Sequence, residues 1–148
     1  MNLRLLISLG CAIWISTSAV IGVTGAAQAQ GTELGKNEYL KSCASCHGVT
    51  GKGNGPVIKS LIKPPPDLTK LSEANKGVFP FSRIYDVIDG RIEIMTHGTR
   101  DMPVWGDVYT REWNSGLPPN LMSKELAEAM VRVRMLMLIE YIASLQGR

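Results

Sequence analysis

Cysteine is scarce in this chain of 148 residues, which contains only Cys11, Cys43 and Cys46. Three thiols cannot form the set of several disulfides that supports many small secreted domains. No second pair of closely spaced cysteines is present, so a zinc site built from two such pairs is excluded. The sequence also offers no serine, paired-carboxylate or additional cysteine arrangement that would form a separate catalytic centre.

Net charge is low as well. Sixteen lysine and arginine residues face thirteen aspartate and glutamate residues, which gives a formal charge of +3. This excess is too small to argue for a nucleic-acid partner on its own, and we predict none. The length corresponds to one domain, and the apolar content with mixed charges suits an ordinary globular protein.

The two closely spaced cysteines belong to the stretch Cys43-Ala44-Ser45-Cys46-His47. Two cysteines separated by two residues and followed at once by histidine are typical of covalent c-type haem attachment. The thiols can form thioethers with the haem vinyl groups, and His47 can offer an imidazole nitrogen to the iron. A redox-active disulfide is the alternative, but a thioredoxin-like motif needs alternating strands and helices around it. We therefore predict one haem c, attached through Cys43 and Cys46 and ligated by His47.

The first residues have the pattern of an export signal. Arg4 gives a positive start, residues 5–23 are largely apolar, and Ala27-Gln28-Ala29 supplies the small residues that a signal peptidase reads. We expect residues 1–29 to be a secretory signal and residues 30–148 to be an exported, periplasmic domain. An uncleaved anchor on the outer face of the cytoplasmic membrane is the alternative, because the apolar run is long enough to span a bilayer.

Helix signals recur at three places in the mature part. The expected helices cover about Glu33 to Ser42 after a Thr32 cap, Phe81 to Asp89 before Gly90, and a last helix from the Ser123 cap to about Gln146. Glycine and proline predict a long irregular loop from Gly48 to Pro80, and we expect a polar loop over residues 107–122. The last helix is apolar on nearly every side, which indicates either a broad core face or a docking face.

Met102 is the predicted second ligand of the iron. A thioether is a soft ligand, and His/Met ligation is the electron-transfer pairing that raises the haem potential. Pro103 biases Met102 away from helical backbone, so an extended chain can direct the side chain over the haem. His97 is the competing ligand and would give a lower potential. Met95 is expected in the core, as are the methionines of the last helix.

Taken together, these features resemble class I cytochrome c, the small His/Met monohaem proteins. The matching residues are Gly35 and Tyr39 in the early helix, Cys43 to His47, the loop at Pro64-Pro65-Pro66-Asp67-Leu68, the helix before Gly90, Met102-Pro103 and Tyr141. The resemblance implies an all-α cytochrome c fold, with three to five helices wrapped around one covalently bound haem. It implies that the first and last helices cross near Gly35, Tyr39 and Tyr141, and that His47 and Met102 are the axial ligands. The long link from Gly106 to Met122 and the apolar last helix depart from the family.

The function expected from these residues is electron transfer in the periplasm rather than catalysis. The chain would carry one electron between a redox-protein donor and acceptor, such as a dehydrogenase or a terminal oxidase. One alternative is a haem-bearing relay subunit of a periplasmic dehydrogenase or oxidase complex. A third reading, an enzyme or gas sensor, requires an open or labile coordination position on the iron. Membrane contact is expected only if the signal is retained as an anchor.

Overall fold

The computed structural model describes residues 23–91, 102–116 and 123–147, and over these residues it contains helices and no strand. The expected all-α class is confirmed. The α-helices are α1 (Val23–Ser42), α2 (Ala44–His47), α3 (Phe81–Asp89), α4 (Trp105–Gly116) and α5 (Lys124–Ser144). Three short 3-10 helices lie between α2 and α3, namely η1 (Ile58–Ser60), η2 (Leu68–Lys70) and η3 (Glu73–Asn75).

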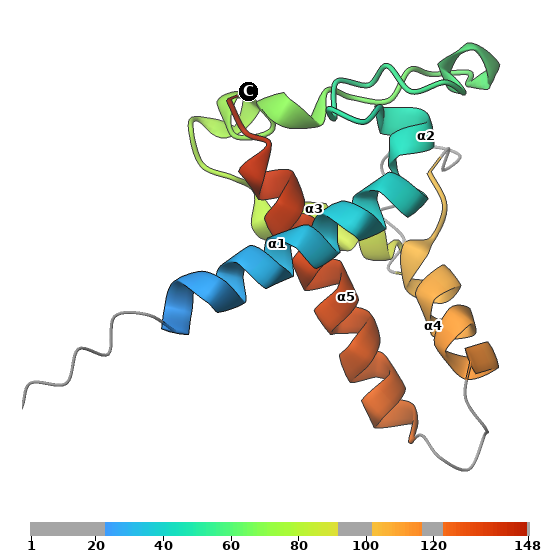
Figure 1. Ribbon diagram of the computed structural model, residues 1–148. Coiled ribbons are helices and arrows are strands. Elements are labelled where there is room, and N and C mark those ends of the chain that lie inside the picture. Colours follow the sequence, from blue (N-terminus) through green and yellow to red (C-terminus); the bar gives the residue numbers. More distant parts are fainter. Residues whose placement is uncertain (1–22, 92–101, 117–122, 148) are drawn as a thin grey trace, which may run out of the picture.

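Helices α1 and α5 cross at the centre of the molecule (Figure 1). At the crossing Gly35 is buried, and a Cβ added there would overlap the carbonyl oxygen of Met137. The rings of Tyr39 and Tyr141 lie 5.2 Å apart at an interplanar angle of 50°, a tilted arrangement that aromatic pairs favour. The crossing that the resemblance implied is therefore confirmed, and Gly35 is present because the two backbones approach closely there.

The last helix begins as the sequence predicts and ends at Ser144, two residues before the expected end at about Gln146. Ser123 Oγ accepts a hydrogen bond from the Leu126 amide at 3.2 Å, which is an N-terminal cap. Beyond the end of α5, Gly147 has φ 74°. The buried side of the helix is broad and comprises Ala127, Val131, Met135, Leu138, Ile139, Tyr141 and Ile142. Leu126, Val133 and Leu136 remain exposed, so the apolar character of α5 exceeds what the core uses.

The middle helix α3 covers the predicted residues. Gly90 follows it with φ 65°, and its amide donates to the Asp86 carbonyl at 2.9 Å. A glycine in this left-handed conformation is a common helix ending, because it carries no Cβ to clash. The structure thus confirms both the extent of α3 and the residue that stops it.

Two boundary predictions are wrong. Residues 107–116 belong to α4 rather than to a polar loop. Trp105, Val108, Tyr109 and Trp113 recur at helical spacing and turn one face of α4 to the core. Helix α1 begins at Val23 instead of Glu33, so Thr32 lies inside the helix and does not cap it. The preceding Ala-Ala-Gln-Ala-Gln run consists of strong helix formers, which extend the helix backwards.

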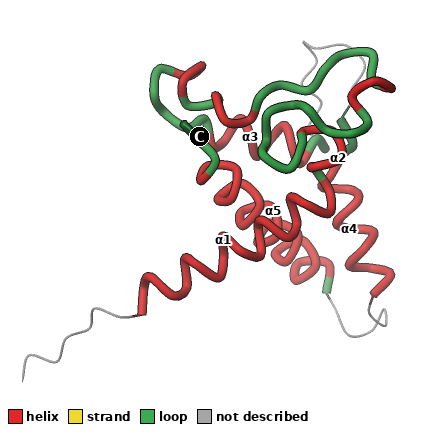
Figure 2. The backbone as a smooth tube through the Cα atoms, turned by 45° about the horizontal axis from the view of Figure 1, so that its top comes forward, coloured by secondary structure: helices red, strands yellow, loops and turns green. Residues whose placement is uncertain are grey.

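The chain between α2 and α3 follows one side of the molecule as an irregular loop (Figure 2), as expected. Asp67 caps η2, because its Oδ1 accepts from the Thr69 amide at 2.9 Å and from the Thr69 hydroxyl at 2.6 Å. Gln146 then holds this loop to the end of α5. Its amide group donates to the Leu68 carbonyl at 2.8 Å, and its side-chain oxygen accepts from the Ser72 amide at 2.9 Å.

Within the described part of the chain, no helix combines the length and the hydropathy needed to cross a bilayer. The apolar run of residues 5–23 lies almost entirely outside the described residues. Whether residues 1–29 are removed therefore stays a prediction.

Candidate functional site

The cysteine motif lies where α1 ends. The Cys43 amide donates to the Tyr39 carbonyl at 2.9 Å, which continues the helical pattern of α1, and α2 begins at the next residue. Cys43 is buried and Cys46 is half-buried, and both are free thiols. The two side chains are thus presented by one short, rigid piece of backbone, as attachment at two points requires.

The buried thiol of Cys43 is held in its protonated form. Burial raises its pKa to about 12, and the negative charge of Glu38 adds to the effect. The thiolate is the form that oxidises most readily, so a protonated Cys43 resists disulfide formation.

The loop that follows the motif closes onto α2. Three backbone amides of the loop donate to carbonyls of the motif: Gly53 to His47 at 2.8 Å, Gly55 to Cys46 at 3.0 Å and Val57 to Ser45 at 3.2 Å. A Cβ on Gly55 would overlap the Ser45 carbonyl oxygen, so only glycine allows this approach. The Tyr39 hydroxyl adds a hydrogen bond to the Gly48 carbonyl at 2.6 Å. The orientation of the motif is thus fixed by backbone contacts.

His47 is half-buried, and its Nδ1 lies 3.4 Å from the Pro66 carbonyl oxygen. An Nδ1–H donating to this carbonyl leaves the lone pair on Nε2, which is then the nitrogen that can bind a metal. Burial lowers the pKa of His47, while the contact with Pro66 opposes the shift. The neutral imidazole, the form that binds metals, is therefore favoured at neutral pH.

Met102 lies just before α4 in backbone that is not helical, as Pro103 predicts. The side chain is half-buried and packs against the core. Trp105 and Val108 of α4 are in the same group of partly buried residues. The competing ligand His97 and the expected core residue Met95 lie outside the described residues, so the structure does not compare them with Met102.

The chemistry of these donors fits a haem better than a bare metal ion. Across residues 23–91, 102–116 and 123–147, no three His, Cys, Asp or Glu side chains cluster as metal ligands would. Two surface hollows of about 320 and 220 Å³ lie against α5, and neither is lined by Cys43, Cys46 or His47. The two free thiols and the oriented imidazole, rather than the shape of a cavity, are the features that fit a haem.

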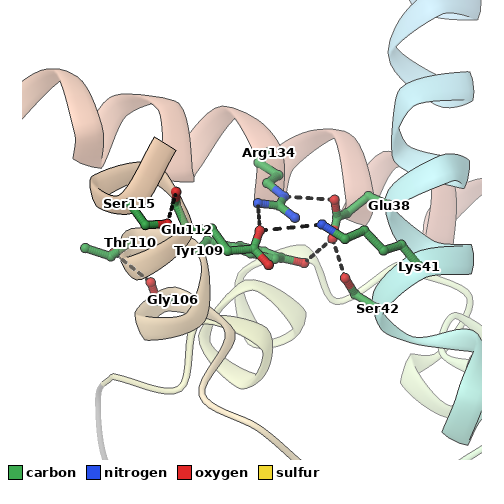
Figure 3. Close-up of polar contacts among 9 residues, drawn as sticks. All are labelled: Glu38, Lys41, Ser42, Gly106, Tyr109, Thr110, Glu112, Ser115 and Arg134. Atoms are coloured by element: carbon green, nitrogen blue, oxygen red, sulfur yellow. Dashed lines mark hydrogen bonds and ion pairs between the residues drawn. The ribbon is translucent and has the colours of Figure 1, made fainter. Parts of the chain in front are cut away.

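A group of charged side chains beside the motif was missed from the sequence. Arg134 of α5 donates to Glu38 of α1 at 2.8 Å and to Glu112 of α4 at 2.7 Å (Figure 3). The Tyr109 hydroxyl and the Ser42 hydroxyl both donate to the other oxygen of Glu38, at 3.0 and 2.5 Å. The only signal in the sequence was Arg134 itself, a charged residue set among the apolar residues in the second half of α5.

Burial and hydrogen bonding act in opposite directions on this group. Burial alone would raise the pKa of Glu38, but hydrogen bonds from Arg134 and Ser42, with the charge of Arg134, hold that pKa below its ordinary value. Burial and the nearby Glu38 charge raise the pKa of Tyr109. At neutral pH, Glu38 is therefore an anion and Tyr109 a neutral donor.

A sequence model for one protein family matches residues 30–113, which is more than half of the chain, and that family is described as cytochrome c oxidase, cbb3-type, subunit III. The chain belongs to this family. The match covers the cysteine motif, His47 and Met102, and it identifies a c-type cytochrome domain. The predicted cytochrome is thus confirmed, and the class I features are compatible with it. A search of curated proteins and a search of solved structures gave no match.

Membership of this cytochrome family indicates the cofactor of the chain and its general role. A c-type cytochrome domain carries covalently bound haem c, and its role is electron transfer rather than catalysis. Cys43, Cys46 and His47 have the spacing that such attachment needs. The residue assignments, the number of haems and the cellular location go further than the family match.

Proposed function

We propose that the chain is an exported carrier of one electron, with one haem held through Cys43 and Cys46 and with His47 and Met102 as axial ligands. The observation that carries the proposal is the geometry of the motif, in which free thiols and an imidazole directed by Pro66 lie on one fixed turn. When bound, the haem iron takes up and releases a single electron. The protein residues hold it, orient it and keep water away.

Each axial residue has a separate support. His47 has its Nδ1 engaged with a backbone carbonyl, so Nε2 is the ligating atom. Met102 precedes α4 in non-helical backbone and packs on the core, which holds a soft sulfur ligand in apolar surroundings. His47 and Met102 would together fill both axial positions, so a substrate would have no coordination position and the haem would supply electron transfer.

Replacing Met102 by alanine tests the ligand assignment. The ferric holoprotein should lose the sulfur-to-iron absorption band at the red end of its spectrum. The reduction potential should fall by on the order of 0.1 V, since axial ligands set potentials over a range of about 0.8 V. Met130→Ala is the matched control, because Met130 lies half-buried on α5 and should leave both readings unchanged. A Met102→Ala spectrum identical to that of the wild type would reject Met102 as ligand.

The proposed place of action is the periplasm, after removal of residues 1–29. The positive start, the apolar run and the Ala27-Gln28-Ala29 site support it. Retention of the run as an anchor on the outer face of the membrane is the alternative. The mass of the protein purified from its native host decides between them, because cleavage after Ala29 removes the whole segment.

A second candidate is that the chain acts as a relay subunit of a terminal oxidase complex. The description of the family names such an oxidase. The exposed apolar side chains of α5, Leu126, Val133 and Leu136, are of the kind that a partner subunit covers. Oxygen-consuming activity that co-purifies with this chain from native membranes would support a complex, whereas recovery only as a free monomer would contradict it.

Exposed lysines support contact with an acidic redox partner in either case. They belong to the loop that closes on the haem motif and are Lys52, Lys59, Lys63, Lys70 and Lys76. Charges of one sign around a contact surface mainly raise the rate of association, and this effect weakens as salt concentration increases. A rate of electron exchange with an acidic partner that falls with salt would be the expected signature.

A further inference from the structure

Helix α4 is joined to α1 and α5 by charges that the proposed electron transfer does not use. The side chains of Arg134 and Glu38 are only 18% and 12% exposed. The Arg134 Nε donates to Glu38 at 2.8 Å, and its Nη1 donates to Glu112 at 2.7 Å. The donors of a guanidinium lie in one fixed plane. Its hydrogen bonds to carboxylates therefore fix the relative orientation of the side chains as well as the distance between them. One side chain therefore fixes the relative placement of three helices.

Tyr109 is the residue of α4 that contacts both Glu38 and Arg134. It is completely buried, and its hydroxyl donates to Glu38 at 3.0 Å. The Arg134 guanidinium carbon lies 3.9 Å from the centre of the Tyr109 ring, which is a cation–π contact. Trp105, at the first position of α4, has its ring centre 5.5 Å from that of Tyr109. A continuous set of contacts thus runs from Arg134 through the Tyr109 ring to Trp105, at the N-terminal end of α4.

The two ends of this group lie next to the two parts of the haem site. On α1, Glu38 accepts from Ser42 at 2.5 Å, and Ser42 directly precedes Cys43. On the other side, the ordered end of α4 directly follows Met102, Pro103 and Val104. The contacts therefore connect the segment that carries the covalent attachment with the segment that carries the sixth ligand.

We propose that Glu38, Tyr109 and Arg134 are positioning residues that keep Met102 on the iron by fixing α4 against α1 and α5. This inference rests on the proposed His/Met ligation. A protein ligand that leaves the iron part of the time lets an added ligand bind, and the apparent affinity of that added ligand reports the fraction of open molecules. A buried ion pair is weak support for stability in itself, because removing charges from water is costly. The role proposed for this ion pair is to fix the placement of the three helices relative to one another.

Titration of the ferric holoprotein with imidazole tests the proposal, with loss of the sulfur-to-iron band as the readout. Arg134→Met removes the guanidinium but keeps an apolar side chain of similar length. It should tighten apparent imidazole binding about tenfold, a coupling of the usual size between two sites. Tyr109→Phe should shift the affinity in the same direction by a smaller factor, because the ring remains and only the hydroxyl is lost.

Two controls separate positioning from charge and from general stability. Lys41→Met removes a positive charge from the same group, since Lys41 lies 3.6 Å from Glu112, but its side chain is 63% exposed. Val131→Ala cuts a fully buried side chain of α5 outside the group and lowers stability. Both should bind imidazole with the affinity of the wild type. If Arg134→Met binds as the wild type does, or if Val131→Ala shifts the affinity as much, the proposal is overturned.

The outcomes also distinguish this proposal from the one on which it rests. A wild-type spectrum without the sulfur band rejects His/Met ligation, and a Met102→Ala variant that keeps the band rejects Met102 as the ligand; either result rejects the positioning role as well. A wild type with the band, together with unchanged imidazole binding in the Arg134 and Tyr109 variants, rejects the positioning role alone. If Arg134→Met does not fold, Tyr109→Phe decides the result, because it alters a single hydroxyl.

Discussion

The crossing of α1 with α5 and the junction of α1, α4 and α5 lie within one turn of each other on α1, yet they are held by different forces. At the crossing, Gly35 lets two backbones touch and Tyr39 packs on Tyr141. At the junction, Glu38 and Arg134 bring opposite charges into a partly dry site. The crossing depends on close packing of two backbones, whereas the junction depends on oriented hydrogen bonds between charged side chains. The two regions should therefore respond differently to substitution and to pH.

Gly35→Ala should have the largest effect, because the new methyl group would overlap the Met137 carbonyl oxygen. Overfilling a tight contact of this kind forces the helices apart, and we expect a loss of about 3 kcal/mol in the free energy of unfolding. Urea denaturation followed by circular dichroism measures it. Gly31→Ala is the matched control on the same helix. Its Cβ would meet only the flexible Glu140 carboxylate, at 3.2 Å, so stability should be unchanged or slightly higher. Equal losses in both variants would show that the crossing is looser than described.

Glu38→Gln should have an intermediate effect that depends on pH. The pKa of Glu38 lies below its unfolded value, so the carboxylate contributes stability above the unfolded pKa, and this contribution is lost as pH falls through the folded pKa. The variant should be less stable than the wild type by about 2 kcal/mol at neutral pH, with the difference shrinking in acid. Denaturation at a series of pH values tests this. Glu33→Gln breaks only the exposed pair with Lys36 and should change stability by less than about 0.5 kcal/mol.

Tyr109→Phe should have the smallest effect of the three. The ring keeps its contacts with Arg134 and Trp105, and one hydrogen bond to Glu38 is lost, which we expect to cost about 1 kcal/mol. The effect should be smaller in a Glu38→Gln background, because the acceptor is then a neutral amide oxygen instead of a carboxylate. Additive losses in the double variant would mean that Tyr109 and Glu38 act independently.

The sequence predicted the parts of this fold that local chemistry determines. The extent of α3 follows from its apolar spacing and Gly90, and the start of α5 follows from Ser123. The crossing at Gly35 was implied by family resemblance and is now explained by close backbone approach. The cysteine motif specifies its chemistry by spacing alone, and the family match supports it.

The rest could not be predicted because it depends on partners far apart in the chain. Gly106 and the polar residues after it obscured the apolar spacing of α4 and suggested a loop. The Arg134 contact with Glu38 joins residues 96 positions apart, and neither residue type indicates its partner. The placement of His97 relative to the iron lies outside the described residues, so its exclusion as ligand stays a prediction.

The contact between Gln146 and the loop has a consequence for the order in which the site is completed. Gln146 lies 78 residues after Leu68, whose carbonyl it binds, so this fastening forms only when the end of α5 has docked against the loop. Before docking, the loop beside the motif lacks the contacts that Gln146 supplies. In an exported chain, the attachment site is therefore most accessible before the last helix has packed.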